Sequence, residues 1–202
     1  MKNLQIFRPL PQLRELNLLQ ELEKTPIVSQ RELAIRSGIA LGATNNCLKR
    51  MAEREWIQMK GMNGHRMAYY LTTKGISEKN RLASEMVSRA IEHYVWIKGL
   101  MREKLLEMQN AGVRRIALYG VGDEMEIAYT TLQEFDLKLV GITEDEEMFG
   151  KVEVRGFKLT PVEHIKELDP EGILVTSLSR MEERMKKLEK YIETSAVKIL
   201  CV

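Results

Sequence analysis

The N-terminal third of the chain repeats apolar positions with the period of an α-helix. After Pro11, leucines recur every third or fourth residue as far as Leu22, and Pro26 ends the stripe. This spacing predicts a first helix between the two prolines. Ser29, with Glu32 three positions later, is the pattern of a capping box and predicts the start of a second helix.

A third helix is predicted from about Leu41 to Glu55, after a turn of small residues. Its spacing places Thr44, Leu48 and Met51 on an inward face. The segments WIQMK and MAYYLTT then predict two strands of a hairpin, which enclose the tip GMNGHR. The residues expected on the outward face of the third helix are Asn45, Asn46, Lys49, Arg50 and Glu53.

The longest helical pattern follows Gly75 and ends near Asn110. Apolar residues recur near every third or fourth position, and no proline interrupts them. A helix of this length extends about 50 Å, which is more than a small domain covers. A second copy of the same helix is the obvious partner, so a two-fold homodimer is predicted. The alternative is a helix that packs only against its own C-terminal domain.

The last ninety or so residues change to continuous apolar runs separated by helical segments. RRIALYG, LKLVGIT, GILVTSLS and AVKILCV are expected to be strands, and DEMEIAYTTLQEF and RMEERMKKLEKYIE are expected to be helices. Such an alternation predicts a parallel sheet covered on both faces, in a doubly wound, Rossmann-like domain. The predicted fold is therefore a multidomain α/β chain, with a winged helix-turn-helix (α+β) at 1–75, a long connecting helix at 76–110 and a Rossmann-like domain at 111–202.

The residue types of the predicted winged helix-turn-helix suit DNA. Small residues at the start of the third helix leave room for base edges, asparagines can bond adenine bidentately, and cations can bind phosphates. The hairpin tip adds a basic group within reach of a minor groove. Each residue taken alone also fits a solvated surface helix with a polar hairpin. With double-stranded DNA as partner, the candidate contacts are Ala43, Asn45, Asn46, Lys49, Arg50, His65 and Arg66.

Two stretches of this N-terminal part, SQRELAIRSGIALGATNNCLKRMAEREWI and YYLTTKGISEKNRLASEMVSRAIEHY, resemble the MarR-type winged-helix transcription regulators. The resemblance is nearest to the subgroup found with exopolysaccharide and capsule biosynthesis genes. The motifs NNCLK, LTTKGI and EKNRLA carry it, and it covers roughly residues 11–95. It implies a recognition helix over Leu41–Arg54 and a wing arginine at Arg66.

A ligand crevice is expected beyond the carboxyl ends of the C-terminal strands. The turn GVG is part of a dinucleotide fingerprint, but Met125 replaces the third glycine. Asp123 and Glu124 at the helix N-terminus would repel a pyrophosphate. A hydroxyl-rich effector related to a sugar or a nucleotide is predicted instead. The sequence does not identify a cofactor. The candidate ligand-binding residues are Gly120, Gly122, Glu144, Thr176, Ser177 and Ser179.

The same half of the chain resembles the small Rossmann-like domains of sugar acetyltransferases and nucleotide-sugar enzymes. The stretches ALYGVGDEMEIAYTTL, LVGITEDEE, GKVEVRGFKLTPVEHIKEL and DPEGILVTSLS carry this resemblance. More distantly, the half is similar to the NAD-sensing domain of Rex-type repressors. A vestigial crevice in a domain that only assembles, or docks another protein, is the alternative. A nucleotide-sugar enzyme with a fused winged helix is a third possibility.

The N-terminal and C-terminal parts of the chain also differ in charge. Residues 1–110 hold 18 Lys and Arg against 11 Asp and Glu, whereas residues 111–202 hold 13 against 18. A basic half joined to an acidic half indicates two domains with different partners. The two cysteines have no metal-binding spacing, and neither a long apolar run nor a secretion signal is present, so a cytoplasmic protein that does not span a membrane is expected. No set of residues typical of catalysis or metal binding is found, so we predict that the chain is not an enzyme.

Overall fold

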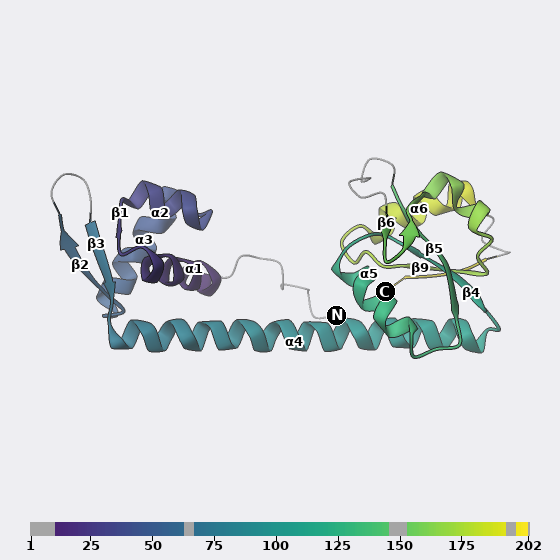
Figure 1. Ribbon diagram of the computed structural model, residues 1–202, viewed down its shortest axis with the longest axis horizontal. Coiled ribbons are helices and arrows are strands. Elements are labelled where there is room, and N and C mark those ends of the chain that lie inside the picture. The colour runs from purple at the N-terminus through teal and green to yellow at the C-terminus, as the bar shows by residue number, and fades with distance from the viewer. Residues whose placement is uncertain (1–10, 63–66, 146–152, 193–196, 202) are drawn as a thin grey trace. The chain divides into compact units, whose positions relative to one another are not determined.

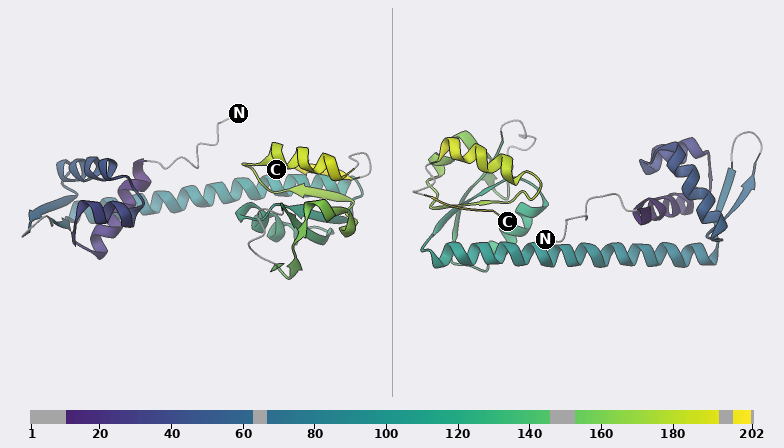
Figure 2. Two further views of the ribbon diagram at one scale, coloured as in Figure 1. Left: turned by 90° about the horizontal axis from the view of Figure 1, so that it is seen from above. Right: turned by 180° about the vertical axis from the view of Figure 1, so that it is seen from behind.

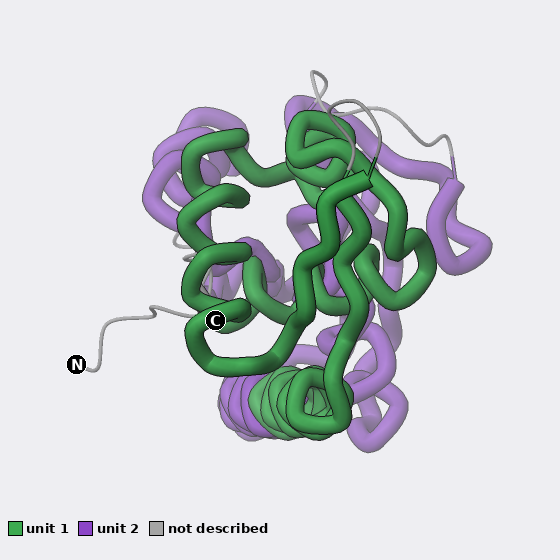
Figure 3. Tube along the Cα trace, turned by 90° about the vertical axis from the view of Figure 1, so that its left-hand side faces the viewer, with its two compact units in different colours: residues 1–90 green, residues 91–202 purple. Residues whose placement is uncertain are grey.

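The computed structural model describes residues 11–62, 67–145, 153–192 and 197–201 (Figure 1). The chain divides into two compact units, Met1–Ala90 and Ile91–Val202 (Figure 3). The long helix α4 (Thr73–Asn110) contributes residues to both units. Within the described residues, no helix combines the length and the apolar character needed to cross a membrane.

The N-terminal unit contains the three helices and the hairpin predicted from the sequence. Strands β1, β3 and β2 form an antiparallel sheet in that order. The two-residue strand β1 was not predicted, because so short a segment carries no period of its own. The elements before α4 are α1 (Pro11–Lys24), β1 (Ile27–Val28), α2 (Gln30–Ser37), α3 (Leu41–Glu53), β2 (Ile57–Gly61) and β3 (Met67–Leu71).

Local side-chain chemistry sets the ends of α2. The Ser29 hydroxyl accepts a hydrogen bond from the backbone N–H of Glu32 at 3.1 Å, which is half of a capping box. The Glu32 carboxylate pairs instead with Arg36, one turn further on, at 2.5 Å. At the other end Gly38 has φ of +63°, a left-handed conformation that glycine adopts without strain, and the chain turns there into α3.

A single hydrophobic core joins α1, α2, α3, the sheet and the start of α4. The predicted inward face of α3 is confirmed, since Thr44, Leu48 and Met51 are buried. Leu82 of α4 is buried in the same core. The other members of the core are Leu16, Leu18, Leu19, Leu22, Val28, Leu33, Ile39, Cys47, Trp56, Ile57 and Tyr69.

The C-terminal unit is built on a five-stranded sheet whose strands are all parallel, in the order β10-β9-β4-β5-β8. The chain runs from β4 through β5 to β8 at one edge of the sheet. It then returns to β9, on the other side of β4, and ends with β10 at the opposite edge. The parallel sheet predicted from the apolar runs is therefore confirmed. Its strands are β4 (Arg115–Tyr119), β5 (Lys138–Glu144), β8 (Thr160–Pro161), β9 (Gly172–Val175) and β10 (Lys198–Cys201).

Helices cover both faces of this sheet, with α4 on one side and α6 on the other (Figure 2). The C-terminal part of α4 and helix α5 pack on one face, through residues such as Met101, Leu105 and Ala128. The other face is covered by α6 and a 3-10 helix, through Leu188 and Ile165. The elements outside the sheet are α5 (Asp123–Leu132), β6 (Glu153–Val154), β7 (Phe157–Lys158), the 3-10 helix η2 (Val162–Leu168) and α6 (Met181–Tyr191).

Two glycines of α4 provide a matched test of this packing. A Cβ on Gly75 would overlap the backbone carbonyl of Trp56, so we expect Gly75→Ala to destabilise the N-terminal unit by more than 1 kcal/mol, the order of cost of overpacking. A Cβ on Gly99 would meet nothing within 4 Å, so Gly99→Ala should stabilise the helix by about 0.5–1 kcal/mol. Urea unfolding followed by circular dichroism measures both, and equal effects of the two substitutions would contradict the packing described.

Candidate nucleic-acid interface and ligand crevice

Helix α3 presents a polar face to solvent. Asn46, Lys49 and Arg50 are exposed, as predicted from their spacing. Asn45 is only half-buried, and its Oδ1 is buried without a hydrogen-bond partner among the described residues. The amide of Asn46 is therefore more open to a partner than that of Asn45. Ala43 is half-buried at the start of the helix.

Arg50 has a partner inside the protein that the sequence pattern did not reveal. Glu15 of α1 has a side chain only 8% exposed, and it lies 3.3 Å from Nη2 of Arg50 and 3.6 Å from Nη1 of Arg54. Arg50 also donates to Sγ of the buried Cys47 at 3.3 Å. A nearly buried carboxylate needs such pairing, so Arg50 has a structural role besides any contact with a phosphate.

The wing is formed by β2 and β3, paired antiparallel from Ile57 opposite Leu71 to Gly61 opposite Met67. The candidate residues His65 and Arg66 lie outside the described residues. Lys60, an exposed cation near the end of β2, was not singled out from the sequence.

In the C-terminal unit, three of the six candidate ligand residues meet at the carboxyl ends of adjacent strands. Gly120 follows β4, Glu144 ends β5, and Thr176 follows β9. The Thr176 hydroxyl donates to the backbone carbonyl of Gly120 at 2.8 Å. Ser177 is half-buried, whereas Gly122 and Ser179 are exposed.

Arg184 of α6, which was not predicted from the sequence, lies at these strand ends against Gly120 and Glu144. Its Nη2 lies 2.7 Å from Oε1 of Glu144, and the two side chains are only 3% and 1% exposed. The other Glu144 oxygen accepts the backbone N–H of Val121 at 2.6 Å. Because both carboxylate oxygens are bonded within the protein, a ribose or sugar hydroxyl would have to compete for Glu144.

The guanidinium of Arg184 lies 4.9 Å from the centre of the Tyr119 ring. It also packs against Gly120, where φ is +114° and a Cβ would overlap Nη1. Its Nε and Nη1 are buried without a hydrogen-bond partner among the described residues. In the sequence, Arg184 is one charge among many on a helix of alternating charges, so only the tertiary structure distinguishes it.

A second buried acid, Asp145, extends this network. It accepts a hydrogen bond from the Tyr119 hydroxyl at 2.7 Å and pairs with Lys187 at 2.9 Å. Burial by itself raises the pKa of Asp145, but the bonds from Lys187 and Tyr119 outweigh it and hold that pKa below its usual range. The pKa of Tyr119 is raised, first by burial and then by Asp145. The described residues contain no group of three or more His, Cys, Asp or Glu placed to hold a metal ion.

Residues 13–58, from α1 to the start of β2, match the family model described as winged helix-turn-helix DNA-binding. The N-terminal unit contains a winged helix-turn-helix. The match ends near the start of the hairpin, and the sequence matches none of the curated proteins with which it was compared.

Several solved structures are similar to parts of the chain. A MarR-family regulator from Silicibacter pomeroyi is 18% identical with a TM-score of 0.34, and the match covers 42% of this chain and 55% of that one. ZitR from Lactococcus lactis, solved in complex with DNA, is 18% identical with a TM-score of 0.32, over 48% and 70% of the two chains. RSP, a Rex-family repressor, is 15% identical with a TM-score of 0.32, over 95% and 84%.

The chain thus spans little more than half of the Silicibacter protein. Because these TM-scores lie below 0.5, the three similarities do not establish a shared function.

The Glu144–Arg184 pair makes a direct prediction about stability. Glu144→Ala leaves Arg184 buried without its counter-charge, so we expect a loss of about 3–5 kcal/mol in the unfolding free energy of the C-terminal unit. The double variant Glu144→Leu with Arg184→Met removes both charges and should regain most of that loss. Urea unfolding of the full chain measures both variants. A single variant as stable as the wild type would show that the pair is not buried in solution.

Proposed function

We propose that this chain is a DNA-binding transcription regulator of the MarR type, with α3 as the recognition helix. The observation that carries the proposal is the exposed pair Asn46 and Lys49 on the outer face of a winged helix-turn-helix. The sequence resemblance over residues 11–95 supports the MarR assignment, and the link to exopolysaccharide genes stays a prediction. In this proposal Asn46 bonds a base edge, Lys49 binds a phosphate and no residue is catalytic.

A homodimer completes the proposal. Between Met86 and Trp96, helix α4 exposes six large apolar side chains, each with 41–61% of its surface in contact with solvent. Val87, Ile91 and Tyr94 lie along one side of the helix by their spacing. A second copy would cover this apolar surface, and the two-fold axis would present two recognition helices to successive major grooves.

The role of the C-terminal unit is open to two proposals. The strand order around β4 and β9 is that of a doubly wound sheet, which supports a Rossmann-like domain with a ligand crevice at that point. A sugar- or nucleotide-derived effector would then have to separate Arg184 from Glu144. The buried pair favours the second role, in which the domain assembles or docks and holds no effector. Thermal shifts against a panel of nucleotides and nucleotide sugars separate the two roles.

DNA binding is tested by two substitutions on α3. Lys49→Ala should weaken binding to every duplex and lower the salt slope, log K against log salt, by about 0.9, because one phosphate contact is lost. Asn46→Ala should cost about 1–3 kcal/mol only on duplexes enriched from a random library by the wild-type protein. Fluorescence anisotropy at several salt concentrations measures both.

Lys138→Ala is the control, since it removes an exposed cation from the C-terminal unit. It should leave the salt slope unchanged. A wild-type protein without salt-dependent DNA affinity would overturn the regulator proposal.

The dimer is tested on α4. Val87→Glu combined with Ile91→Glu should convert the protein to a monomer, because like charges would be buried against their symmetry mates. Arg89→Glu lowers the net charge by the same two units but lies on the opposite side of the helix, so it should leave the dimer intact. Light scattering at micromolar concentration measures the mass. A monomeric wild type would contradict this part of the proposal.

A further inference from the structure

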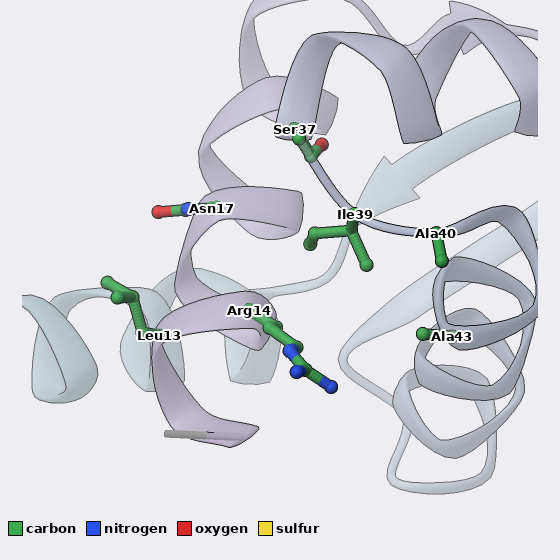
Figure 4. A pocket seen from close by; sticks show the side chains of 8 residues that line it. Leu13, Arg14, Asn17, Ser37, Ile39, Ala40 and Ala43 are labelled. Atoms are coloured by element: carbon green, nitrogen blue, oxygen red, sulfur yellow. The ribbon is translucent and has the colours of Figure 1, made fainter. Parts of the chain in front are cut away.

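A hollow of about 220 Å³ lies beside the N-terminal end of α3 (Figure 4). The first turns of α1 form one wall, and the turn between α2 and α3 forms another. The Arg14 side chain extends from α1 in the direction of α3, on which Ala43 lies (Figure 4). The residues that matter for its chemistry are Arg14, Asn17, Ser37, Ile39, Ala40 and Ala43.

The charge of Arg14 is not balanced within this hollow. Arg14 is half-buried, and it forms no ion pair with any described residue. The adjacent acid on α1, Glu15, is already paired with Arg50 and Arg54. Among the described residues that line the hollow, none is acidic. The described residues that line the hollow thus give Arg14 no acidic counter-charge.

Other donors at the hollow also lack partners. The Ser37 Oγ is buried and has no hydrogen-bond partner among the described residues. Helix α3 begins after Ala40, whose methyl group cannot cap it, and no side chain in the described part of the chain takes that role. The first backbone N–H groups of α3 thus have no partner within the helix, and this end of the helix carries partial positive charge. The cation, the hydroxyl and the helix end all favour an anion.

We propose that this hollow binds one backbone phosphate of the DNA duplex and that Arg14 is its anchor. The inference rests on the proposed function, because it requires α3 to lie against DNA. The hollow borders the start of the recognition helix, where Ala40, Gly42 and Ala43 are too small to keep a sugar-phosphate strand away. A guanidinium can bond two phosphate oxygens at once. A phosphate held there fixes how deeply α3 enters the groove and so positions Asn46 on its base.

Substitution of Arg14 tests the anchor. Arg14→Ala should weaken binding to a mixed-sequence duplex roughly tenfold at about 100 mM salt and lower the salt slope by about 0.9. Arg14→Lys keeps the charge but not the planar fork, so it should restore the slope and only part of the affinity. Arg114→Ala, which removes an exposed arginine of the C-terminal unit, is the matched control and should change neither quantity.

Substitution of Ala40 tests the site in a second way, by comparing the Tm of the protein with its affinity for DNA. Ala40→Ser supplies a neutral cap and Ala40→Asp a charged one, so each should raise the Tm by about 2–4 °C. Only the Asp carboxylate competes with a phosphate for Arg14 and the helix end. We therefore expect DNA affinity to fall at least tenfold in Ala40→Asp and to change much less in Ala40→Ser. Because Ala40→Asp should also raise the Tm, misfolding would not explain its loss of affinity.

Two outcomes overturn the inference and leave the proposed function standing. If Arg14→Ala matches the wild type in affinity and slope while Lys49→Ala does not, Arg14 contacts no phosphate of DNA. If inorganic phosphate at about 10 mM raises the Tm of the wild type but not of Arg14→Ala, and Arg14→Ala still binds DNA normally, the hollow takes a free anion instead. A wild-type protein that binds no DNA overturns both the inference and the proposed function.

Discussion

One helix has to serve two hydrophobic cores, and much of the molecule follows from that constraint. Leu82 of α4 is buried in the core of the N-terminal unit, whereas Ile97, Met101, Leu105 and Met108 are buried in the core of the C-terminal unit. The helix therefore needs apolar positions in both of the parts that contact a core. Between these two sets, from Met86 to Trp96, large apolar side chains are exposed among the described residues, and this exposure is the basis of the proposed dimer.

The sequence was most informative where burial repeats with a regular period. The leucines of α1 and the inward positions of α3 predicted their helices, and continuous apolar runs predicted the parallel strands. Contacts between elements have no such period. Glu15 is charged and lies on an amphipathic helix, so its burial against Arg50 and Arg54 was not foreseeable from spacing. Asn45 and Asn46 are adjacent in sequence, and only the packing of α3 shows which one is open to solvent.

The carboxyl ends of the strands in the C-terminal unit show the same limit. The position of Glu144 at the end of β5 was predicted, but the side chain that meets it comes from α6, forty residues away. Glycine at position 120 lets that guanidinium lie against the backbone, a use of the glycine that differs from the close approach of a ligand. The strand pattern therefore predicted that Glu144 lies at the end of β5, but it did not predict that Arg184 pairs with it there.

The pairing of Glu15 with Arg50 has a consequence for the search kinetics of the proposed regulator. An arginine already bonded to an internal acid gains less from a DNA phosphate than a free one, since it exchanges one anion for another. In the proposed function, that difference would lower the affinity of Arg50 for the phosphates of any sequence and would leave the proposed contact of Asn46 with a base unchanged. A regulator held less firmly at each wrong sequence leaves it sooner, so in the proposed function Glu15 would shorten the residence time on non-specific DNA.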